Sequence, residues 1–392
     1  MSQNPSRREL LKGGLASMAG LAAMGIPFLA LPALGQEETL VPFTDFPANF
    51  NPNPGPGRRF FDTRTINNFI TPADQFYTFQ HNGQPQLDPA THKVKITGMF
   101  GKTADITLDQ IKALRPTLEQ VVAYECGGNG PRNNAQGMVS NARWKGVNLA
   151  AVLKQAGLSA EAKEVVFYGA DTFTEDVAHG GRGAPTKLEN VNYARSLTVD
   201  HAMKPEVMLA YELNGAPLTI NQGAPLRLIV PGWYGVAQVK FVTRIHAQEN
   251  RFVGKYMSRD YVTMKQRQVN GETEWTEYTV GPIQLKSVVS RVTKTGNTVK
   301  IMGFALTDLT PLKAIEVKID DGPWQAASLD RQNTATSWKL FSYTWNSATP
   351  GEHTVVSRAI DVNGKVQQEV ADPTKTTIWE NPEQMPRKIV IS

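Results

Sequence analysis

Cys126 is the only cysteine among the 392 residues of this chain. It lies in the segment Y-E-C-G-G-N-G-P-R-N, after the strand-like run V-V-A-Y-E and before a glycine-rich turn. A lone cysteine cannot form a disulfide within its own chain, so it is an inert buried residue, a nucleophile or a metal ligand. The local sequence leaves these three alternatives open.

The region around Cys126, from Thr71 to about Glu249, mixes two kinds of element. Two stretches, T-L-D-Q-I-K-A-L and N-L-A-A-V-L-K-Q-A-G-L, carry apolar residues at helical spacing, and each follows a capping residue, Thr107 or Asn148. Short β-branched runs alternate with them: V-K-I-T-G, V-V-A-Y, V-V-F-Y-G, L-R-L-I-V-P and V-K-F-V-T-R-I. We therefore predict an α+β domain over residues 71–265.

The carboxy-terminal part differs in its predicted secondary structure. After the polar stretch Gln266–Gly281, which we interpret as a linker, short strands follow one another without a helical period. The segments D-D-G and V-N-G fall where hairpin turns are expected. About six strands in about a hundred residues indicate a small immunoglobulin-like β-sandwich, and we assign residues 266–392 to it.

The amino terminus has the pattern of a twin-arginine export signal. S-R-R-E-L-L-K precedes an apolar stretch rich in glycine and alanine, and A-L-G offers a cleavage site after Gly35. An uncleaved membrane anchor is the alternative, because the stretch is about long enough to span a bilayer. We expect residues 1–35 to be removed, which gives a periplasmic protein without stable membrane insertion. Residues 36–70, with N-P-N-P-G-P-G, are predicted to form an extended arm.

The bulk composition is that of a globular protein. With 41% apolar and 20% charged residues, the chain is long enough for two or three domains. The net charge of +5 is spread along the sequence, and removal of the signal, with its three cations and one acid, lowers it to +3. This distribution argues against nucleic acid as a partner.

Four separated motifs resemble the sulfite oxidase family of molybdenum enzymes, over both domains and in the family's order. They are C-G-G-N-G, A-R-W-K-G-V-N-L, L-A-Y-E-L-N-G-A-P-L and G-A-P-L-R-L-I-V-P-G-W-Y-G-V-A-Q-V-K. The resemblance implies a sulfite-oxidase-like molybdopterin-binding domain, with Cys126 as the one protein ligand of the molybdenum beside the dithiolene sulfurs of molybdopterin. A soft thiolate suits such a metal.

The resemblance also implies roles for other residues. Tyr211 matches the tyrosine that the family places beside the equatorial oxo group, and His81 and Arg132 are further catalytic candidates. Arg227 and Lys240 are implied as the cationic contacts of the cofactor. The remaining implied cofactor-binding residues are Phe79, Gln80, His81, Asp171, Gln222, Gln238 and Val239.

Two positions depart from the family pattern. Phe79 stands where an arginine that helps to bind sulfite is typical, and Gln222 replaces a histidine that often contacts the cofactor. Loss of a cation should weaken the binding of a dianion unless another base replaces it. The nearby candidates in the sequence are Arg132 and Arg182.

The family chemistry would oxidise sulfite to sulfate by oxygen-atom transfer. With one cysteine, the chain has no C-x-x-C-H site for a covalent haem, so we expect a separate periplasmic c-type cytochrome to accept the electrons. The carboxy-terminal domain resembles the family's dimerisation domain, so we expect a homodimer. The alternatives are another molybdenum enzyme on this scaffold, such as a sulfane dehydrogenase component or a sulfoxide reductase, and a binding protein that has lost the metal.

Overall fold

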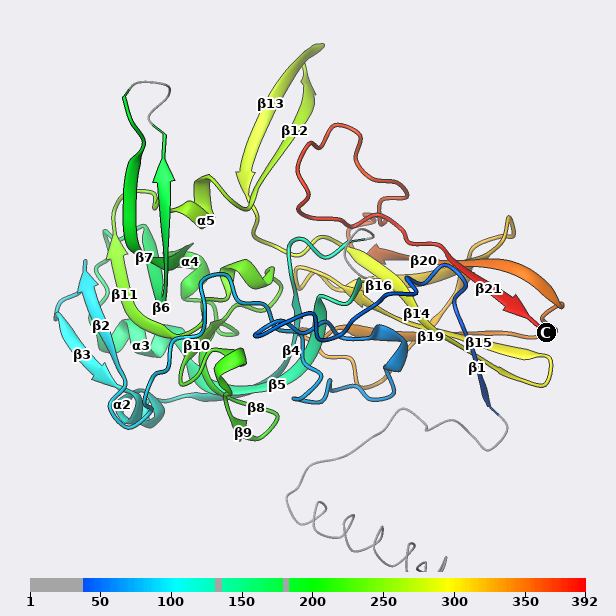
Figure 1. Ribbon diagram of the computed structural model, residues 1–392, viewed down its shortest axis with the longest axis horizontal. Helices are drawn as coiled ribbons and strands as arrows, with labels where there is room; N and C mark the ends of the chain where they lie inside the picture. Colours follow the sequence, from blue (N-terminus) through cyan, green and yellow to red (C-terminus); the bar gives the residue numbers. More distant parts are fainter. Residues whose placement is uncertain (1–37, 131–135, 179–182) are drawn as a thin grey trace, which may run out of the picture.

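The β-sheets of the protein form two groups: the sheets of β2 to β11 lie on the left in Figure 1, and those of β14 to β21 lie on the right. The computed structural model describes residues 38–130, 136–178 and 183–392. The predicted signal peptide, Arg132 and Arg182 therefore lie outside the described residues. In the three described ranges, no helix combines the length and the apolar character needed to cross a membrane.

The first group of sheets comes from the middle of the chain. Its strands are β2 (Lys93–Gly98), β3 (Ala104–Thr107), β4 (Thr117–Glu125), β5 (Val139–Asn148), β6 (Glu164–Val177), β7 (Thr186–Thr198), β8 (Met208–Leu213), β9 (Ala216–Pro217), β10 (Arg227–Ile229) and β11 (Val242–Gln248). They form one sheet in the order β10-β8-β5-β4, with β9 on β8, and another in the order β3-β2-β11-β6-β7. All pairs are antiparallel except β2 with β11.

Short helices and 3-10 turns lie before, between and after these strands. They are α2 (Leu108–Ala113), α3 (Leu149–Gln155), α4 (Val199–Ala202) and α5 (Lys255–Ser258), with 3-10 turns η1 (Thr63–Thr65), η3 (Ile220–Gln222) and η4 (Gly235–Ala237). The two predicted helices are confirmed. Thr107 and Gln110 form a capping box at the start of α2, and the Asn148 side chain accepts a hydrogen bond from the Ala151 amide at the start of α3.

The carboxy-terminal group is the predicted β-sandwich. Its strands are β14 (Lys286–Thr295), β15 (Thr298–Leu306), β16 (Leu312–Ile319), β17 (Gln325–Ala326), β18 (Ser328–Leu329), β19 (Lys339–Trp345), β20 (Gly351–Asp361) and β21 (Arg387–Ile391). One sheet has the order β1-β14-β15-β19-β18 and the other β17-β16-β20-β21, where β1 spans Thr39–Val41. The arm thus adds an edge strand to the sandwich, which the sequence did not indicate.

The predicted linker is wrong. Residues 262–279 form a two-stranded antiparallel hairpin, β12 (Val262–Val269) and β13 (Glu272–Thr279), which projects from the body of the protein (Figure 1). The boundary expected after residue 265 falls inside β12. The stretch resembles a linker because it is mostly polar, and eight polar or aromatic side chains of the two strands are exposed. Its β-branched and aromatic residues nevertheless pair across the hairpin, as Val262 does with Thr279 and Thr263 with Tyr278.

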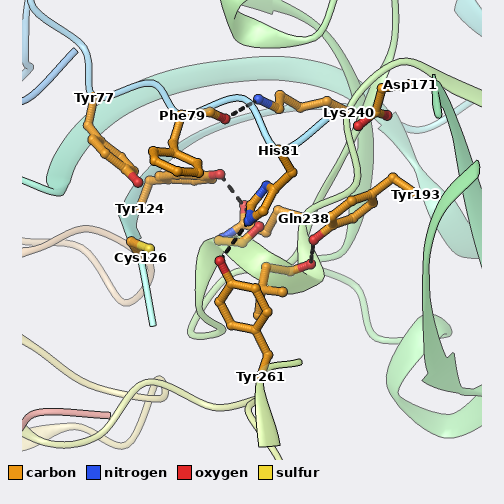
Figure 2. A pocket seen from close by; sticks show the side chains of 12 residues that line it. Tyr77, Phe79, His81, Tyr124, Cys126, Asp171, Tyr193, Gln238, Lys240 and Tyr261 are labelled. Carbon is orange, nitrogen blue, oxygen red and sulfur yellow. Dashed lines mark hydrogen bonds between the residues drawn. The ribbon is translucent and has the colours of Figure 1, made fainter. Parts of the chain in front are cut away.

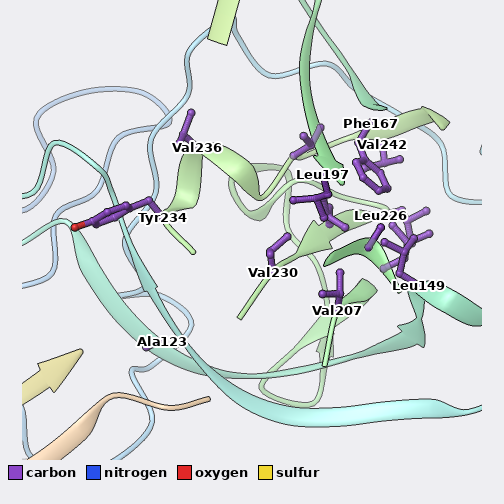
Figure 3. Close-up of a cluster of buried hydrophobic side chains, with 14 of the residues drawn as sticks. Ala123, Leu149, Phe167, Leu197, Val207, Leu226, Val230, Tyr234, Val236 and Val242 are labelled. Carbon is purple, nitrogen blue, oxygen red and sulfur yellow. The ribbon is translucent and has the colours of Figure 1, made fainter. Parts of the chain in front are cut away.

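Both faces of the β4–β5–β8 sheet are buried, and this fixes the direction of the end of β4. Ala123 faces the main core, where side chains from α3, β6, β10 and β11 meet (Figure 3). Val122 and Tyr124 face the opposite way, into a second cluster with Phe76 and Trp144. Because side chains alternate along a strand, Cys126 follows Tyr124 to that second face.

Candidate active site

A pocket lies beyond the carboxyl end of β4, between the two sheets of the first group and the strand β12. Figure 2 shows Cys126 at one side, near Tyr77 and Tyr124, with Lys240 and Asp171 at the opposite side and His81 between them. The lining residues are Tyr77, Phe79, His81, Tyr124, Cys126, Asp171, Tyr193, Gly235, Val236, Gln238, Lys240 and Tyr261. Among the described residues, no group of three or more His, Cys, Asp and Glu side chains could hold a metal ion.

The loop that carries Cys126 is held from several sides. The Cys126 amide donates to the Met138 carbonyl at 3.0 Å, and the Asn129 amide donates to the Cys126 carbonyl at 3.0 Å. The Asn129 side chain donates to Glu125 at 2.9 Å and accepts from the Met138 amide at 3.1 Å. Burial raises the pKa of the Cys126 thiol, while hydrogen bonds from the Gly128 amide and the Tyr77 hydroxyl counteract the shift. A bound metal cation would favour the thiolate.

Lys240 and Asp171 form the charged side of the pocket. The Lys240 ammonium donates to the Phe79 carbonyl at 2.6 Å and to Gln80 Oε1 at 2.5 Å. Burial lowers the pKa of Lys240, and the nearby Arg227 lowers it further. Burial likewise raises the pKa of Asp171, while Lys240 opposes that rise. Burial removes water from both the Lys240 ammonium and the Asp171 carboxylate, so a polar or charged ligand between them would stabilise both charges.

His81 is neutral in this setting. Burial lowers its pKa to about 3, and the charges of Lys240 and Arg58 add to the effect. Its Nε2 lies 2.6 Å from the Tyr261 hydroxyl. A neutral imidazole accepts on one nitrogen, so we assign the Tyr261 hydroxyl as the donor. His81 also packs against Tyr193, whose hydroxyl donates to the Val236 carbonyl at 2.7 Å.

Most of the residues predicted for the site come together in this pocket. Phe79, His81, Cys126, Asp171, Gln238 and Lys240 line it. Gln80 lies at its edge, where it accepts from Lys240 and donates to the Asn221 carbonyl at 2.9 Å.

Tyr211, which the resemblance places beside the equatorial oxo group of the cofactor, is not among the residues that line this pocket, so the structure does not bring it together with Cys126. It lies on β8, at the level of Leu118 and Glu119 in β4, about seven or eight residues from the cysteine, which is on the order of 25 Å along the sheet. There the Lys112 ammonium lies 5.4 Å from its ring centroid. The tyrosines that do line the pocket are Tyr77, Tyr124, Tyr193 and Tyr261.

Three other predicted cofactor contacts lie behind the lining. The buried Arg227 guanidinium donates to the Gln222 carbonyl at 2.9 Å and to the Gln238 carbonyl at 3.0 Å. The Gln222 side chain accepts from the Thr219 amide at 3.0 Å, and the Val239 carbonyl accepts from the Leu228 amide at 2.8 Å. Arg227, Gln222 and Val239 do not face the pocket. They support, from behind, the segment that carries Gln238 and Lys240.

The sequence reasoning missed Tyr77, Tyr124, Tyr193, Gly235, Val236 and Tyr261. The tyrosines lie in strands or turns where an aromatic residue is usually part of the core, so their type carried no signal. Tyr124 was the exception, because it stands two residues before the cysteine and strand alternation places it on the same face.

The donor set fits a pterin cofactor with an anionic group. Asp171 Oδ1 and Gln238 Oε1 are buried and accept no hydrogen bond from the described residues, so they are available to the N–H groups of a heterocycle. Lys240 offers a cation to a phosphate. The free cavity is only about 30 Å³, so a bulky group must displace side chains. The present contacts of Lys240 with Phe79 and Gln80 are ones that an anion can replace.

Comparison with known proteins agrees with this geometry. A family model described as an oxidoreductase molybdopterin binding domain matches residues 81–256. The human mitochondrial sulfite oxidase is 31% identical over 347 residues, and an NADH nitrate reductase of Brassica napus is 28% identical over 316 residues. These matches cover 80% and 70% of this chain but 59% and 32% of the relatives, so the chain spans about three fifths of the sulfite oxidase.

The fold has a counterpart among solved structures. The crystal structure of the sulfane dehydrogenase SoxCD from Paracoccus pantotrophus matches with a TM-score of 0.70 and 21% sequence identity, over 87% of this chain and 89% of that chain. At this identity the match shows a shared fold, which includes both groups of sheets. Together, the family model, the relatives and the pocket show that the chain belongs to the sulfite oxidase family of molybdenum enzymes, which carry a molybdenum-molybdopterin cofactor.

Proposed function

We propose that this protein is a periplasmic sulfite dehydrogenase. The reaction converts one sulfite and one water into sulfate, two protons and two electrons, and the electrons pass singly to a c-type cytochrome. The observation that carries the proposal is the placement of Cys126 and Lys240 at opposite sides of one pocket, with the neutral His81 between them.

The residues divide into two groups by what they would hold. Lys240, Asp171 and Gln238 offer the cation and acceptors that suit molybdopterin, and Cys126 offers the thiolate that suits molybdenum. When bound, this cofactor supplies oxygen-atom transfer and stores the two electrons. Because His81 stays neutral at physiological pH, it can accept a hydrogen bond from Tyr261 without adding charge of its own.

The proposal includes a periplasmic location and a homodimer. The paired arginines Arg7 and Arg8 support export in the folded state, which suits a protein that receives its cofactor in the cytoplasm. The resemblance of the sandwich to a dimerisation domain supports a homodimer.

One observation favours a second candidate. The ring of Phe79 lines the pocket at the position where the family typically has an arginine, so the wall is more apolar than a pocket shaped only for sulfite. A sulfane dehydrogenase component or a sulfoxide reductase would act on a substrate with an apolar part. The sulfane dehydrogenase that shares this fold makes the former worth testing.

The test uses the full chain, exported and loaded with molybdenum. Reduction of cytochrome c is measured with sulfite and with a sulfane sulfur compound, and methionine sulfoxide is tested with a reduced electron donor. We expect turnover with sulfite in the wild type and in the exposed control Lys95→Met, and none in Cys126→Ser. Turnover of another substrate in place of sulfite would select the second candidate, and a protein without molybdenum would overturn both.

A further inference from the structure

Phe79 lies between two cations that reach it from different parts of the chain. On one side, the Lys240 ammonium lies 2.6 Å from the Phe79 carbonyl oxygen. On the other, the guanidinium carbon of Arg58 lies 4.9 Å from the centroid of the Phe79 ring. The ring of Phe79 is part of the pocket wall, so Arg58 stands at the edge of the pocket.

The amino-terminal arm places Arg58 there through its backbone. Arg59 and Thr78 exchange hydrogen bonds of 2.9 and 3.0 Å, which ties the arm to the segment that leads into Phe79. The Arg58 amide donates to the Gly55 carbonyl at 3.1 Å and closes a tight turn. Gly57, in the middle of this turn, has a φ of +70°, and a Cβ there would lie 2.5 Å from Gln80 Cγ. Only glycine allows so close an approach.

The Arg58 guanidinium is available to bind a ligand. No described residue forms a hydrogen bond or an ion pair with it, and its side chain is exposed, so its five N–H donors are available. The neighbouring Arg59 differs, because its Nε donates to Asn53 Oδ1 at 3.2 Å. The ring of Phe79 supports Arg58 by a cation–π contact and limits where its head group can lie.

The charge of Arg58 reaches into the pocket. It acts on His81 together with Lys240, and both disfavour the protonated imidazole. Asp171 is the one acid among the described residues that line the pocket, and it interacts with Lys240. The side of the pocket next to Phe79 therefore carries positive charge without a matching carboxylate among the described residues.

We propose that Arg58, delivered by the arm, binds the oxygens of an anionic substrate at the edge of the pocket and so takes the place of a cation at position 79. The planar guanidinium can donate two parallel hydrogen bonds to a small oxoanion with two or more terminal oxygens. This inference rests on the proposed function and names its substrate class. From the sequence, Arg132 and Arg182 were the candidates for the cation that replaces the arginine typical at position 79, and both lie outside the described residues. In this proposal Arg58 takes that role.

The test compares Arg58→Gln, Arg58→Lys and the matched control Arg59→Gln in the molybdenum-loaded full chain. Steady-state kinetics with sulfite give KM and kcat, and sulfate is the probe for competitive inhibition. Loss of one charge-assisted interaction predicts an increase of about 10- to 100-fold in KM and in the sulfate inhibition constant for Arg58→Gln. We expect partial recovery in Arg58→Lys, no change in Arg59→Gln and unchanged molybdenum content in all three.

The outcomes separate this inference from the proposed function. If Arg58→Gln keeps wild-type KM and sulfate inhibition with full molybdenum content, Arg58 does not bind the substrate. The same conclusion follows if Arg59→Gln is impaired as strongly, because the effect would then belong to the arm as a whole. If the wild type turns over another oxoanion in place of sulfite, the proposed function fails, and KM for that anion then tests Arg58.

Discussion

The ammonium group of Lys286 lies 2.9 Å from Glu125 Oε1, and the two side chains are 2% and 0% exposed. Lys286 also donates to the Asn129 carbonyl at 3.1 Å. Glu125 is the last residue of β4, and Lys286 is the first residue of β14 in the sandwich. A lysine of the carboxy-terminal domain thus holds the base of the loop that carries Cys126.

Replacing Lys286 by methionine should destabilise the protein strongly. The substitution leaves the Glu125 carboxylate buried without its cation, which costs about 3–5 kcal/mol in comparable cases. Urea unfolding of Lys286→Met checks this, with the exposed Lys365→Met as the control, which should change stability by less than about 0.5 kcal/mol. The double variant Glu125→Leu with Lys286→Met should recover much of the loss, and a double variant as unstable as the single one would contradict the charge argument.

Tyr193 and Tyr211 should differ in their effects on turnover. Tyr193 lines the pocket and its hydroxyl is fixed by Val236, whereas Tyr211 lies far along β8. We expect Tyr193→Phe to lower kcat with sulfite at least about 10-fold, which corresponds to about 1.4 kcal/mol in the barrier. Tyr211→Phe should keep kcat close to the wild-type value. The opposite ranking would restore Tyr211 as the residue that acts at the site.

Lys240→Met should lose the cofactor. Its ammonium is the one lysine cation that lines the described pocket, and a charge-assisted bond to a phosphate contributes enough to change affinity about 10- to 100-fold. Elemental analysis of the purified protein after extensive dialysis should find less molybdenum per chain in Lys240→Met than in Lys240→Arg. The exposed Lys95→Met serves as the control, and full molybdenum content in Lys240→Met would remove Lys240 from the cofactor site.

The sandwich should lose a little stability as the pH rises from about 6.5 to 8. His353 Nδ1 lies 2.7 Å from Asp320 Oδ2. Burial lowers the pKa of His353, but the hydrogen bonds to Asp320 and to the Thr349 carbonyl outweigh burial and raise the pKa above 6.5. Burial also raises the pKa of Asp320, yet His353 and the Thr354 amide bring it below 3.8. The stabilisation is therefore complete between about pH 4 and 6.5 and declines as His353 loses its proton.

Unfolding experiments over this pH range can detect the decline. The expected loss is below about 1 kcal/mol, because the Asp320 side chain is 47% exposed and solvent screens the pair. Asp320→Asn should flatten the change with pH, whereas its exposed neighbour Asp321→Asn should leave the wild-type slope. Equal slopes in the wild type and Asp320→Asn would show that the pair contributes nothing.

Local signals in the sequence predicted the parts of the fold that depend on local physics. The capping side chains of Thr107 and Asn148 marked the starts of α2 and α3, and β-branched runs marked most strands. The strand β7 was not predicted from the sequence, because its first half, Thr186 to Asn192, is mostly polar and forms an exposed hairpin with β6. Nothing in such a stretch distinguishes a projecting strand from a loop until its partner is known.

The site was predictable only where a motif fixed the position of a residue. Cys126, Asp171 and Lys240 were found because they stand in or beside distinctive motifs. Tyr211 stands in an equally distinctive motif, but its strand carries it to the far end of the sheet. Arg58 could not be predicted for a different reason. It lies in a Pro- and Gly-rich segment, and such a sequence does not indicate where on the fold the segment will pack.

The edge strand β1 also has a consequence for the order of synthesis. Leu40 pairs with Thr293, and the Thr44 hydroxyl donates to the Lys388 carbonyl, 344 positions later in the chain. A ribosome delivers the arm before its partners, so β1 has nothing to pair with until β14 has been made. The contacts of the arm with β14 and with Lys388 therefore join segments that are far apart in the sequence, and we expect them to form after the local hairpins of the sandwich.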